Sequence, residues 1–264
     1  MLKSKRLFLV VSLILSIFSS LAVVNADSTF IDKKNLDNGV ININYNGDKQ
    51  VAVKVIKDSV NYDYVLNGNN NIPLQGGNGK YDILLLENIG GTKYKQIAKE
   101  SVELKLRNQD NVYLQSIQMI YWNENMQAIK KANELTKGLK TDSEKVKVIY
   151  DYIVNNIKYD HGKAANPGSN YIPNIDRTLS TKYGICYDYS SLFAAMLRSQ
   201  GIPTKLVMGY KNDMDEYHAW NQVYIEDLGK WVTIDTTYDA ALIKDNLKVN
   251  MIKSSSEYRI EKVY

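Results

Sequence analysis

The spacing of apolar and polar residues changes near residue 115. Before that point, short runs rich in valine, isoleucine and tyrosine alternate with turn-forming asparagine and glycine, as is typical of antiparallel strands. The runs cover residues 40–45, 51–56, 62–66, 81–86, 94–98 and 102–106. Their number and spacing predict an antiparallel β-sandwich over residues 27–115, with an immunoglobulin- or fibronectin-like arrangement.

After residue 115 the period lengthens to that of helices. Residues 123–139 predict a helix within a connector over 116–140. Thr141 and Glu144 form a capping-box pattern ahead of an apolar stripe that ends near Ile157, which predicts a second helix. Residues 160–180 hold prolines and glycines and predict a long loop. The following segments predict a helix near residue 186, a strand over 204–210 and a hairpin, so the fold class is α+β.

The first 26 residues carry the pattern of a secretory signal peptide. Basic residues precede an apolar run over 7–24, and small residues stand before Asp27. The alternative is an uncleaved membrane anchor, because roughly 18 apolar residues can span a bilayer. The expectation is therefore a secreted or cell-surface protein. The abundance of asparagine, lysine, isoleucine and tyrosine favours a bacterial source.

Composition excludes several classes of function. The chain has one cysteine and two histidines among 264 residues, which rules out an internal disulfide, a CxxC zinc site and an iron–sulfur cluster. No cofactor or metal is expected. Three of the four net positive charges lie in the signal segment, so the mature chain is nearly neutral. It has no basic block to bind nucleic acid or, after signal cleavage, a membrane.

The single cysteine is the best candidate for chemistry. Cys186 lies at the predicted start of a helix, where unpaired N–H groups and the helix dipole favour a thiolate. His218 opens a later strand and Asp235 lies in its hairpin partner. Thiol catalysis needs a nucleophile, a base and a group that orients the base, and these three residues supply one of each. The alternative is that Cys186 is a small buried apolar residue.

The hairpin leaves the orienting acid open. His218 and Asp235 can share one face of the sheet, because their separation is odd and the turn can have an even length. A regular ladder centred on Leu228 and Gly229 instead places Asp239 opposite His218. Either a bulge shifts the register or Asp239 is the orienting carboxylate.

Residues 141–239 resemble the transglutaminase-like superfamily, a papain-like thiol fold. The resemblance is carried by Gly184-x-Cys186, Leu197-Arg198, Gly201-Ile202-Pro203, His218-Ala219-Trp220 and Trp231-Val232-x-Ile234-Asp235-x-Thr237. It implies a catalytic domain over residues 141–264, in which a catalytic helix packs on an antiparallel sheet. It also implies Cys186 as nucleophile, His218 as base and Asp235, in preference to Asp239, as the orienting acid.

One position departs from the related proteases. Papain-type enzymes carry a glutamine six residues before the cysteine to bind the oxyanion, and Ser180 stands there in this chain. The backbone N–H of Cys186 can supply one donor. A second donor is unassigned, and Tyr183 is one candidate.

Other polar residues have ordinary explanations. His161 is expected to be exposed, with contact to a substrate as the alternative. Asp213, Asp215 and Glu216 lack EF-hand spacing and predict a solvated loop. Aromatic residues near the site are expected to be mainly core, although some can line a groove for a peptide or a glycan.

These patterns predict an exported cysteine-dependent enzyme that transfers acyl groups from amide bonds of proteins or peptides, including cell-wall peptides. The chemistry is that of a transglutaminase, deamidase or peptidase, through a Cys186–His218–Asp235 triad and a thioester. The alternative is a non-catalytic wall- or matrix-binding scaffold.

Overall fold

The computed structural model describes residues 17–18, 29–66, 68, 70–168 and 170–264. The chain divides into two compact units with a boundary between Gln118 and Met119. The predicted signal peptide lies outside the described residues, except for Ile17 and Phe18. Over the part of the chain that the structure describes, no helix is long and apolar enough to cross a membrane.

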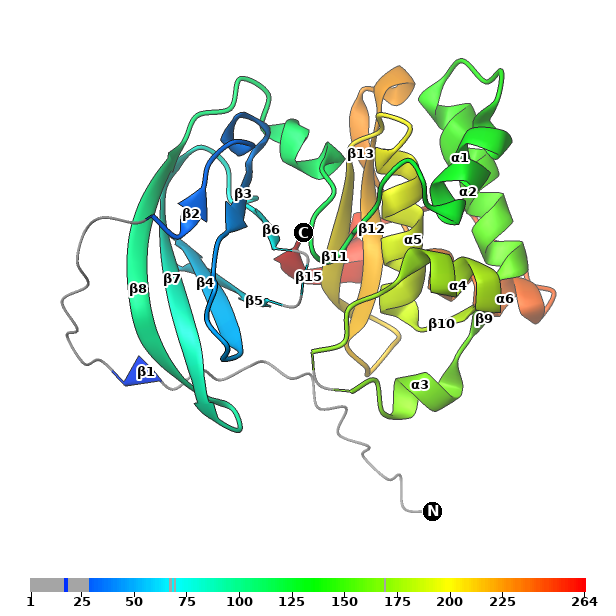
Figure 1. The fold of residues 1–264 in the computed structure, drawn as a ribbon. Coiled ribbons are helices and arrows are strands. Elements are labelled where there is room, and N and C mark those ends of the chain that lie inside the picture. The colour runs from blue at the N-terminus through cyan, green and yellow to red at the C-terminus, as the bar shows by residue number, and fades with distance from the viewer. Residues whose placement is uncertain (1–16, 19–28, 67, 69, 169) are drawn as a thin grey trace. The chain divides into compact units, whose positions relative to one another are not determined.

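The first unit, up to Gln118, consists of two sheets. One sheet has the order β1-β8-β7-β4-β5 and the other the order β2-β3-β6. Their bounds are β1 Ile17–Phe18, β2 Ile31–Asp32, β3 Val40–Ile43, β4 Val51–Lys57, β5 Val60–Val65, β6 Asn71–Pro73, β7 Gly79–Gly90 and β8 Lys93–Leu104. Figure 1 shows β2, β3 and β6 on the inner side of the curved sheet formed by β8, β7 and β4. All pairings are antiparallel except that of β1 with β8. The immunoglobulin-like arrangement remains a prediction.

The strand prediction missed β2 and β6, and it divided β8 into two strands. The runs 94–98 and 102–106 form the single strand β8, which pairs with β7 from Leu104 back to Lys93. The polar residues between the two runs, Lys99 to Ser101, continue this ladder. Backbone hydrogen bonds with a neighbouring strand hold polar and apolar residues equally well, so a polar stretch need not end a strand.

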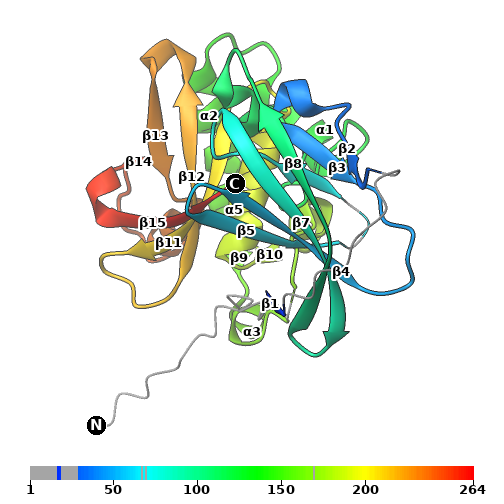
Figure 2. The ribbon, with the colours of Figure 1, turned by 90° about the vertical axis from the view of Figure 1, so that its left-hand side faces the viewer.

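The second unit is built on one five-stranded sheet of order β14-β13-β12-β11-β15 (Figures 1 and 2). Its strands are β11 Thr204–Lys211, β12 His218–Ile225, β13 Lys230–Ile234, β14 Ile252–Lys253 and β15 Tyr258–Val263, and all their pairings are antiparallel. A separate pair, β9 Lys158–Tyr159 and β10 Tyr183–Gly184, is parallel.

Six helices of this unit lie within the described residues. They are α1 Gln127–Thr136, α2 Asp142–Asn156, α3 His161–Ala165, α4 Ile175–Thr181, α5 Cys186–Arg198 and α6 Thr236–Lys244. Helix α5 is the central one, since it packs against β12 and β11 on one side and against α1, α2 and α4 on the others. Eleven of its residues are buried. Mixed helices with an antiparallel sheet confirm an α+β core.

Two segments of this unit differ from the sequence predictions, and one helix agrees with them. The predicted connector over 116–140 is not a separate element, because α1 packs on α2, α4 and α5 within the second unit. The predicted loop over 160–180 contains α3 and α4, whose N-caps are the side chains of Asp160 and Asn174. Helix α2 confirms its prediction, since Thr141 and Glu144 form the expected capping box.

Candidate active site

Cys186 is the first residue of α5 and is partly exposed. Position 186 therefore belongs to the first turn, whose backbone N–H groups have no partner within the helix. Ile185 precedes it in an extended conformation, with φ of −91° and ψ of 175°. The thiol thus lies at the positive end of a thirteen-residue helix, where a negative charge is stabilised.

His218 is the first residue of β12 and only 3% of its surface is exposed. Its Nε2 atom lies 2.8 Å from Oδ2 of Asp235. Cys186 also acts on the imidazole, since it is among the groups that raise the pKa of His218. The thiol therefore lies in the surroundings of the imidazole that Asp235 holds in place.

Asp235 caps one helix and orients the histidine at the same time. Its Oδ1 accepts a hydrogen bond from the backbone N–H of Tyr238 at 3.0 Å, which makes Asp235 the N-cap of α6. Its Oδ2 accepts from His218 and, at 3.1 Å, from the hydroxyl of Tyr258 on β15. With no exposed surface, the carboxylate is held by three donors.

These contacts stabilise the charged imidazole. Burial lowers the pKa of His218, but the Asp235 carboxylate and the interaction with Cys186 outweigh it and raise the pKa to about 10. At neutral pH the ring is therefore an imidazolium, hydrogen-bonded to the Asp235 carboxylate. This is the charge state that accompanies a thiolate.

The choice between Asp235 and Asp239 is decided by register. Ile225 pairs with Lys230, so the turn of this hairpin spans the four residues between them, and the ladder ends at Asn221 and Ile234. Asp235 lies just after β13, not within the partner strand as predicted. Asp239 lies one turn further along α6 and is the wrong candidate: it accepts from Tyr150 at 2.7 Å and pairs with Lys253, and no bond joins it to His218.

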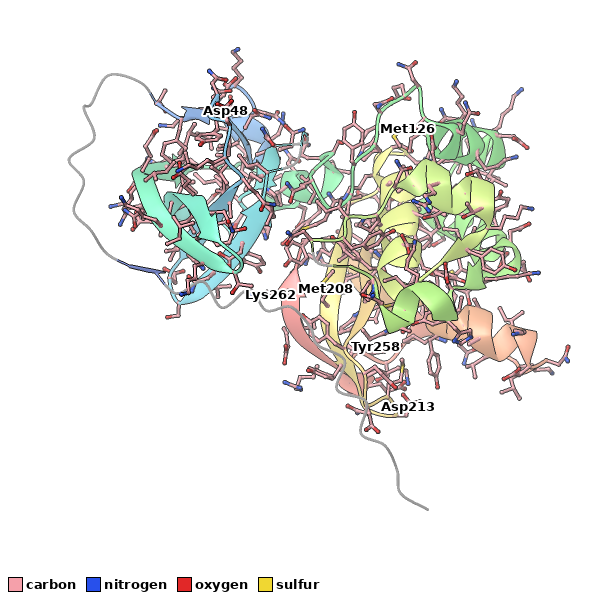
Figure 3. All side chains as sticks on the ribbon, turned by 60° about the horizontal axis from the view of Figure 1, so that its bottom comes forward. Asp48, Met126, Met208, Asp213, Tyr258 and Lys262 are labelled. Carbon is pink, nitrogen blue, oxygen red and sulfur yellow. The ribbon has the colours of Figure 1, made fainter. Side chains whose placement is uncertain are left out.

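Aromatic rings pack against one face of the His218 imidazole. The ring of Trp220 stacks on that of His218, with centroids 6.1 Å apart and planes inclined by 23°. Tyr258 packs on Trp220 at 4.9 Å. Figure 3 shows Tyr258 on β15, with Asp213 in the loop that follows β11. Because Trp220 is fully buried, water is kept from this face of the imidazole.

Two further contacts fix the relative positions of helix and sheet. Asn221 is fully buried, and its Nδ2 donates to the carbonyls of Ser190 on α5 and Lys205 on β11, both at 3.0 Å. Gly209 pairs with His218, and a Cβ atom added there would lie 2.0 Å from the carbonyl oxygen of Arg259. The strand that carries His218 is thereby held to the helix that carries Cys186.

Sequence reasoning missed Tyr159. It lies on β9, whose neighbour β10 leads into α5. The Tyr159 side chain is 36% exposed, and partial burial together with the nearby groups Cys186, Glu216 and Asp160 raises the pKa of its hydroxyl to about 12. The hydroxyl is therefore protonated at neutral pH. No pattern in the linear sequence indicates that Tyr159 lies in the surroundings of Cys186, since the two are 27 residues apart.

The other predicted residues lie away from the thiol and the imidazole. Ser180 donates to the carbonyl of Arg177 within α4, and Tyr183 is 48% exposed on β10. His161 is exposed, as predicted, with its ring 5.0 Å from that of Tyr159. The loop with Asp213 is also exposed. Among the described residues, no group of three histidine, cysteine or acidic side chains can hold a metal ion.

A thiol at a helix N-terminus, facing a histidine and an aspartate on an antiparallel sheet, defines the class of papain-like thiol folds. Residues 129–236 match the family model of the transglutaminase-like superfamily. This match covers 108 of the 264 residues, and this part of the chain is similar to the transglutaminase-like superfamily.

Two relatives cover less than half of this chain. The human kyphoscoliosis peptidase is 31% identical over 121 residues, which cover 42% of this chain and 18% of that protein. A protein-glutamine gamma-glutamyltransferase of Pseudomonas aeruginosa is 32% identical over 78 residues, or 25% of this chain and 12% of the relative. A crystal structure of a TGase is 24% identical, covers 42% of this chain and 29% of its own, and has a TM-score of 0.34. The chain thus spans less than a fifth of the length of these two relatives.

Proposed function

We propose that this protein is a cysteine-dependent enzyme that transfers acyl groups from amide bonds of proteins or peptides. The observation that carries the proposal is the buried pair in which His218 lies 2.8 Å from Asp235, with Cys186 at the start of α5 acting on the same imidazole. The match of residues 129–236 to the transglutaminase-like superfamily supports cysteine-based chemistry in general. The residues assigned here are Cys186 as nucleophile, His218 as proton donor and acceptor, and Asp235 as the residue that orients His218.

In the first step, the thiolate of Cys186 attacks the carbonyl carbon of an amide. The carbon–oxygen π electrons move to oxygen and form a tetrahedral oxyanion. The backbone N–H of Cys186 supports this charge as one donor. The hydroxyl of Tyr159 is our candidate for the second donor, because it lies near the thiol and remains protonated up to about pH 12.

In the second step, the imidazolium of His218 gives its proton to the departing nitrogen. The carbon–nitrogen bond breaks, an amine or ammonia leaves, and the acyl group remains on Cys186 as a thioester. The neutral imidazole then takes a proton from water or from an amine, which attacks the thioester and restores the thiol. Water gives hydrolysis or deamidation, and an amine gives a new amide.

The relatives' names support both outcomes, since one is a peptidase and another a glutamyltransferase. We further propose that the enzyme acts after export, at or outside the cell surface, as the pattern of residues 1–26 indicates. Its substrates there would be proteins or peptides, including peptides of the cell wall.

The test is incubation with a peptide library and a primary-amine donor, with cleavage, deamidation and amine incorporation read by mass spectrometry. We expect product with the wild-type chain and none with Cys186→Ala or His218→Ala. Labelling by a thiol-reactive electrophile should be faster in the wild type than in His218→Ala. A wild-type thiol no more reactive than that of a free peptide, together with full cellular rescue by Cys186→Ala, would instead establish the non-catalytic scaffold.

A further inference from the structure

Helix α5 carries one acidic residue, Asp188, two positions after Cys186. Its carboxylate has no exposed surface. Oδ2 accepts the backbone N–H of Ile185 at 2.8 Å and the ammonium of Lys163 at 2.9 Å, and Oδ1 accepts the hydroxyl of Tyr171. These three donors compensate the cost of burying the Asp188 carboxylate, because a buried carboxylate without partners would be strongly unfavourable.

These bonds hold a chain segment against the cysteine. Lys163 belongs to α3, and Tyr171 follows this helix. Lys163 also donates to the Tyr171 hydroxyl at 2.9 Å and lies 4.8 Å from the centre of its ring. The ring of Tyr171 meets that of Tyr187 edge-on, at 6.3 Å. Segment 161–171 is therefore fastened to the first turn of α5.

The backbone beside Asp188 is shaped to admit its side chain. A Cβ atom added to Gly184 would lie 2.6 Å from the Cβ of Asp188, so only glycine fits at this point. Ile185, whose N–H is bound by Asp188, directly precedes Cys186. The carboxylate thereby sets the direction of the chain as it enters the residue that carries the thiol.

The charge of Asp188 opposes the chemistry unless it is compensated. A carboxylate within two residues of a thiolate raises the energy of that thiolate, and a buried position strengthens the effect. Lys163 is 20% exposed at its side chain and pairs with Asp188 at 2.9 Å. The positive charge of Lys163 therefore offsets the negative charge of Asp188 in its effect on the Cys186 thiolate.

We propose that Asp188 and Lys163 are positioning residues for Cys186, which act as a charge-balanced pair. Asp188 fixes the first turn of α5, and Lys163 keeps its negative charge from opposing the thiolate. The inference rests on the proposed function, because it assigns these residues a role in making the thiol reactive.

The test is the rate of Cys186 alkylation by iodoacetamide, measured against pH. Lys163→Met leaves the carboxylate uncompensated, and we expect the acid limb of the profile to move up by about one pH unit. Asp188→Asn leaves the ammonium uncompensated, and the limb should move down. The double variant Lys163→Met with Asp188→Asn should return towards the wild-type profile. Loss of packing alone cannot move the two single variants in opposite directions.

The Lys163 and Asp188 variants keep all the other titratable residues near the Cys186 thiol. His218 from β12 and Tyr159 from β9 face Cys186, with Asp235, Asp160 and Glu216 beyond them. Tyr171 and Tyr187 face Asp188. Lys147→Met, which breaks an exposed ion pair with Asp151 on α2, is the matched control and should keep the wild-type profile.

The outcomes separate this inference from the proposed function. A slow wild-type thiol that does not depend on His218 would defeat the proposed function. A fast, His218-dependent thiol whose pH profile is the same in both single variants, or moves in one direction in both, would overturn the role of the pair alone. If Lys163→Met fails to fold, Asp188→Asn decides: a downward shift supports the inference and an unchanged profile refutes it.

Discussion

Oδ2 of Asp235 lies 2.8 Å from Nε2 of His218, while Oδ1 of the same carboxylate caps helix α6. One side chain therefore couples the start of a helix to the orientation of an imidazole. Tyr258, from the other edge of the sheet, bonds the same Oδ2 atom at 3.1 Å. The position of the proton donor thus depends on the folding of β12, α6 and β15 together.

The two roles of Asp235 can be separated by substitution. Asparagine can still cap α6, but it lacks the charge that stabilises the imidazolium. We expect Asp235→Asn to keep the stability that the helix cap supplies and to lower turnover by about 10²–10⁴-fold. Asp235→Ala should show the same loss of turnover and a further loss of about 1 kcal/mol in the free energy of unfolding from the missing cap. Urea unfolding and steady-state kinetics measure both, and equal stability of the two variants would contradict the capping role.

The raised pKa of His218 fixes the alkaline limit of activity. Burial lowers this pKa, but Asp235 and Cys186 raise it to about 10, so the imidazolium that gives up the proton persists through neutral pH. The rate should fall as pH rises through about 10. In Asp235→Asn this limb should move to lower pH. The shift also carries a stability term: it is fully present below pH 6.5, the ordinary pKa of histidine, and is lost as pH rises towards 10. A pH–rate profile with the same alkaline limb in both proteins would refute the assignment.

Tyr159→Phe tests the second oxyanion donor. The substitution removes one hydroxyl and keeps the ring, so the fold and the thiol should be unaffected. We expect turnover to fall by about 10²-fold or more, as for other oxyanion donors. The rate of iodoacetamide alkylation, which forms no oxyanion, should stay at the wild-type value. Tyr183→Phe tests the candidate donor named from the sequence, and because this side chain is 48% exposed we expect its turnover to stay unchanged.

Lys253→Met tests whether the Asp239 carboxylate supports the fold and not the reactivity of Cys186. Asp239 is fully buried and paired with Lys253, so removing the ammonium leaves an uncompensated charge and should cost about 3 kcal/mol in the free energy of unfolding. Because Asp239 makes no bond to His218, the alkylation rate of Cys186 should remain that of the wild type below the unfolding temperature. Lys147→Met breaks an exposed pair of the same kind and should leave stability almost unchanged. Equal losses in the two variants would show that burial is not the cause.

Gly209→Ala should displace β15. Its Cβ atom would lie 2.0 Å from the carbonyl oxygen of Arg259, a backbone atom that cannot rotate away. We expect a loss of about 1–3 kcal/mol, typical of overpacking, and slower turnover because Tyr258 moves with β15. Gly162→Ala, whose Cβ meets only an ordinary contact at 3.4 Å, should cause neither effect. Thermal unfolding and steady-state kinetics of the two variants measure these effects, and equal stability of Gly209→Ala and Gly162→Ala would contradict the prediction.

Local patterns predicted the elements that depend on neighbouring residues. Thr141 and Glu144 predicted the start of α2, and the apolar face after Cys186 predicted α5. Both signals arise between residues that are close together in the sequence. The strands β3, β4, β5 and β7 were predicted near their true positions for the same reason. The strand β8 was divided in two, since its continuity depends on pairing with β7 along its whole length.

The sequence alone determined the residue types of the site: one cysteine at a helix start, one histidine at a strand start and two candidate carboxylates. Only the tertiary structure decided between Asp235 and Asp239, because the register of β12 with β13 sets which carboxylate reaches the imidazole. The tertiary structure also places Tyr258 against Asp235 and Lys163 against Asp188, and it places Tyr159 in the surroundings of Cys186. Each of these contacts joins residues far apart in the chain, and their distances follow from packing, which no local pattern records.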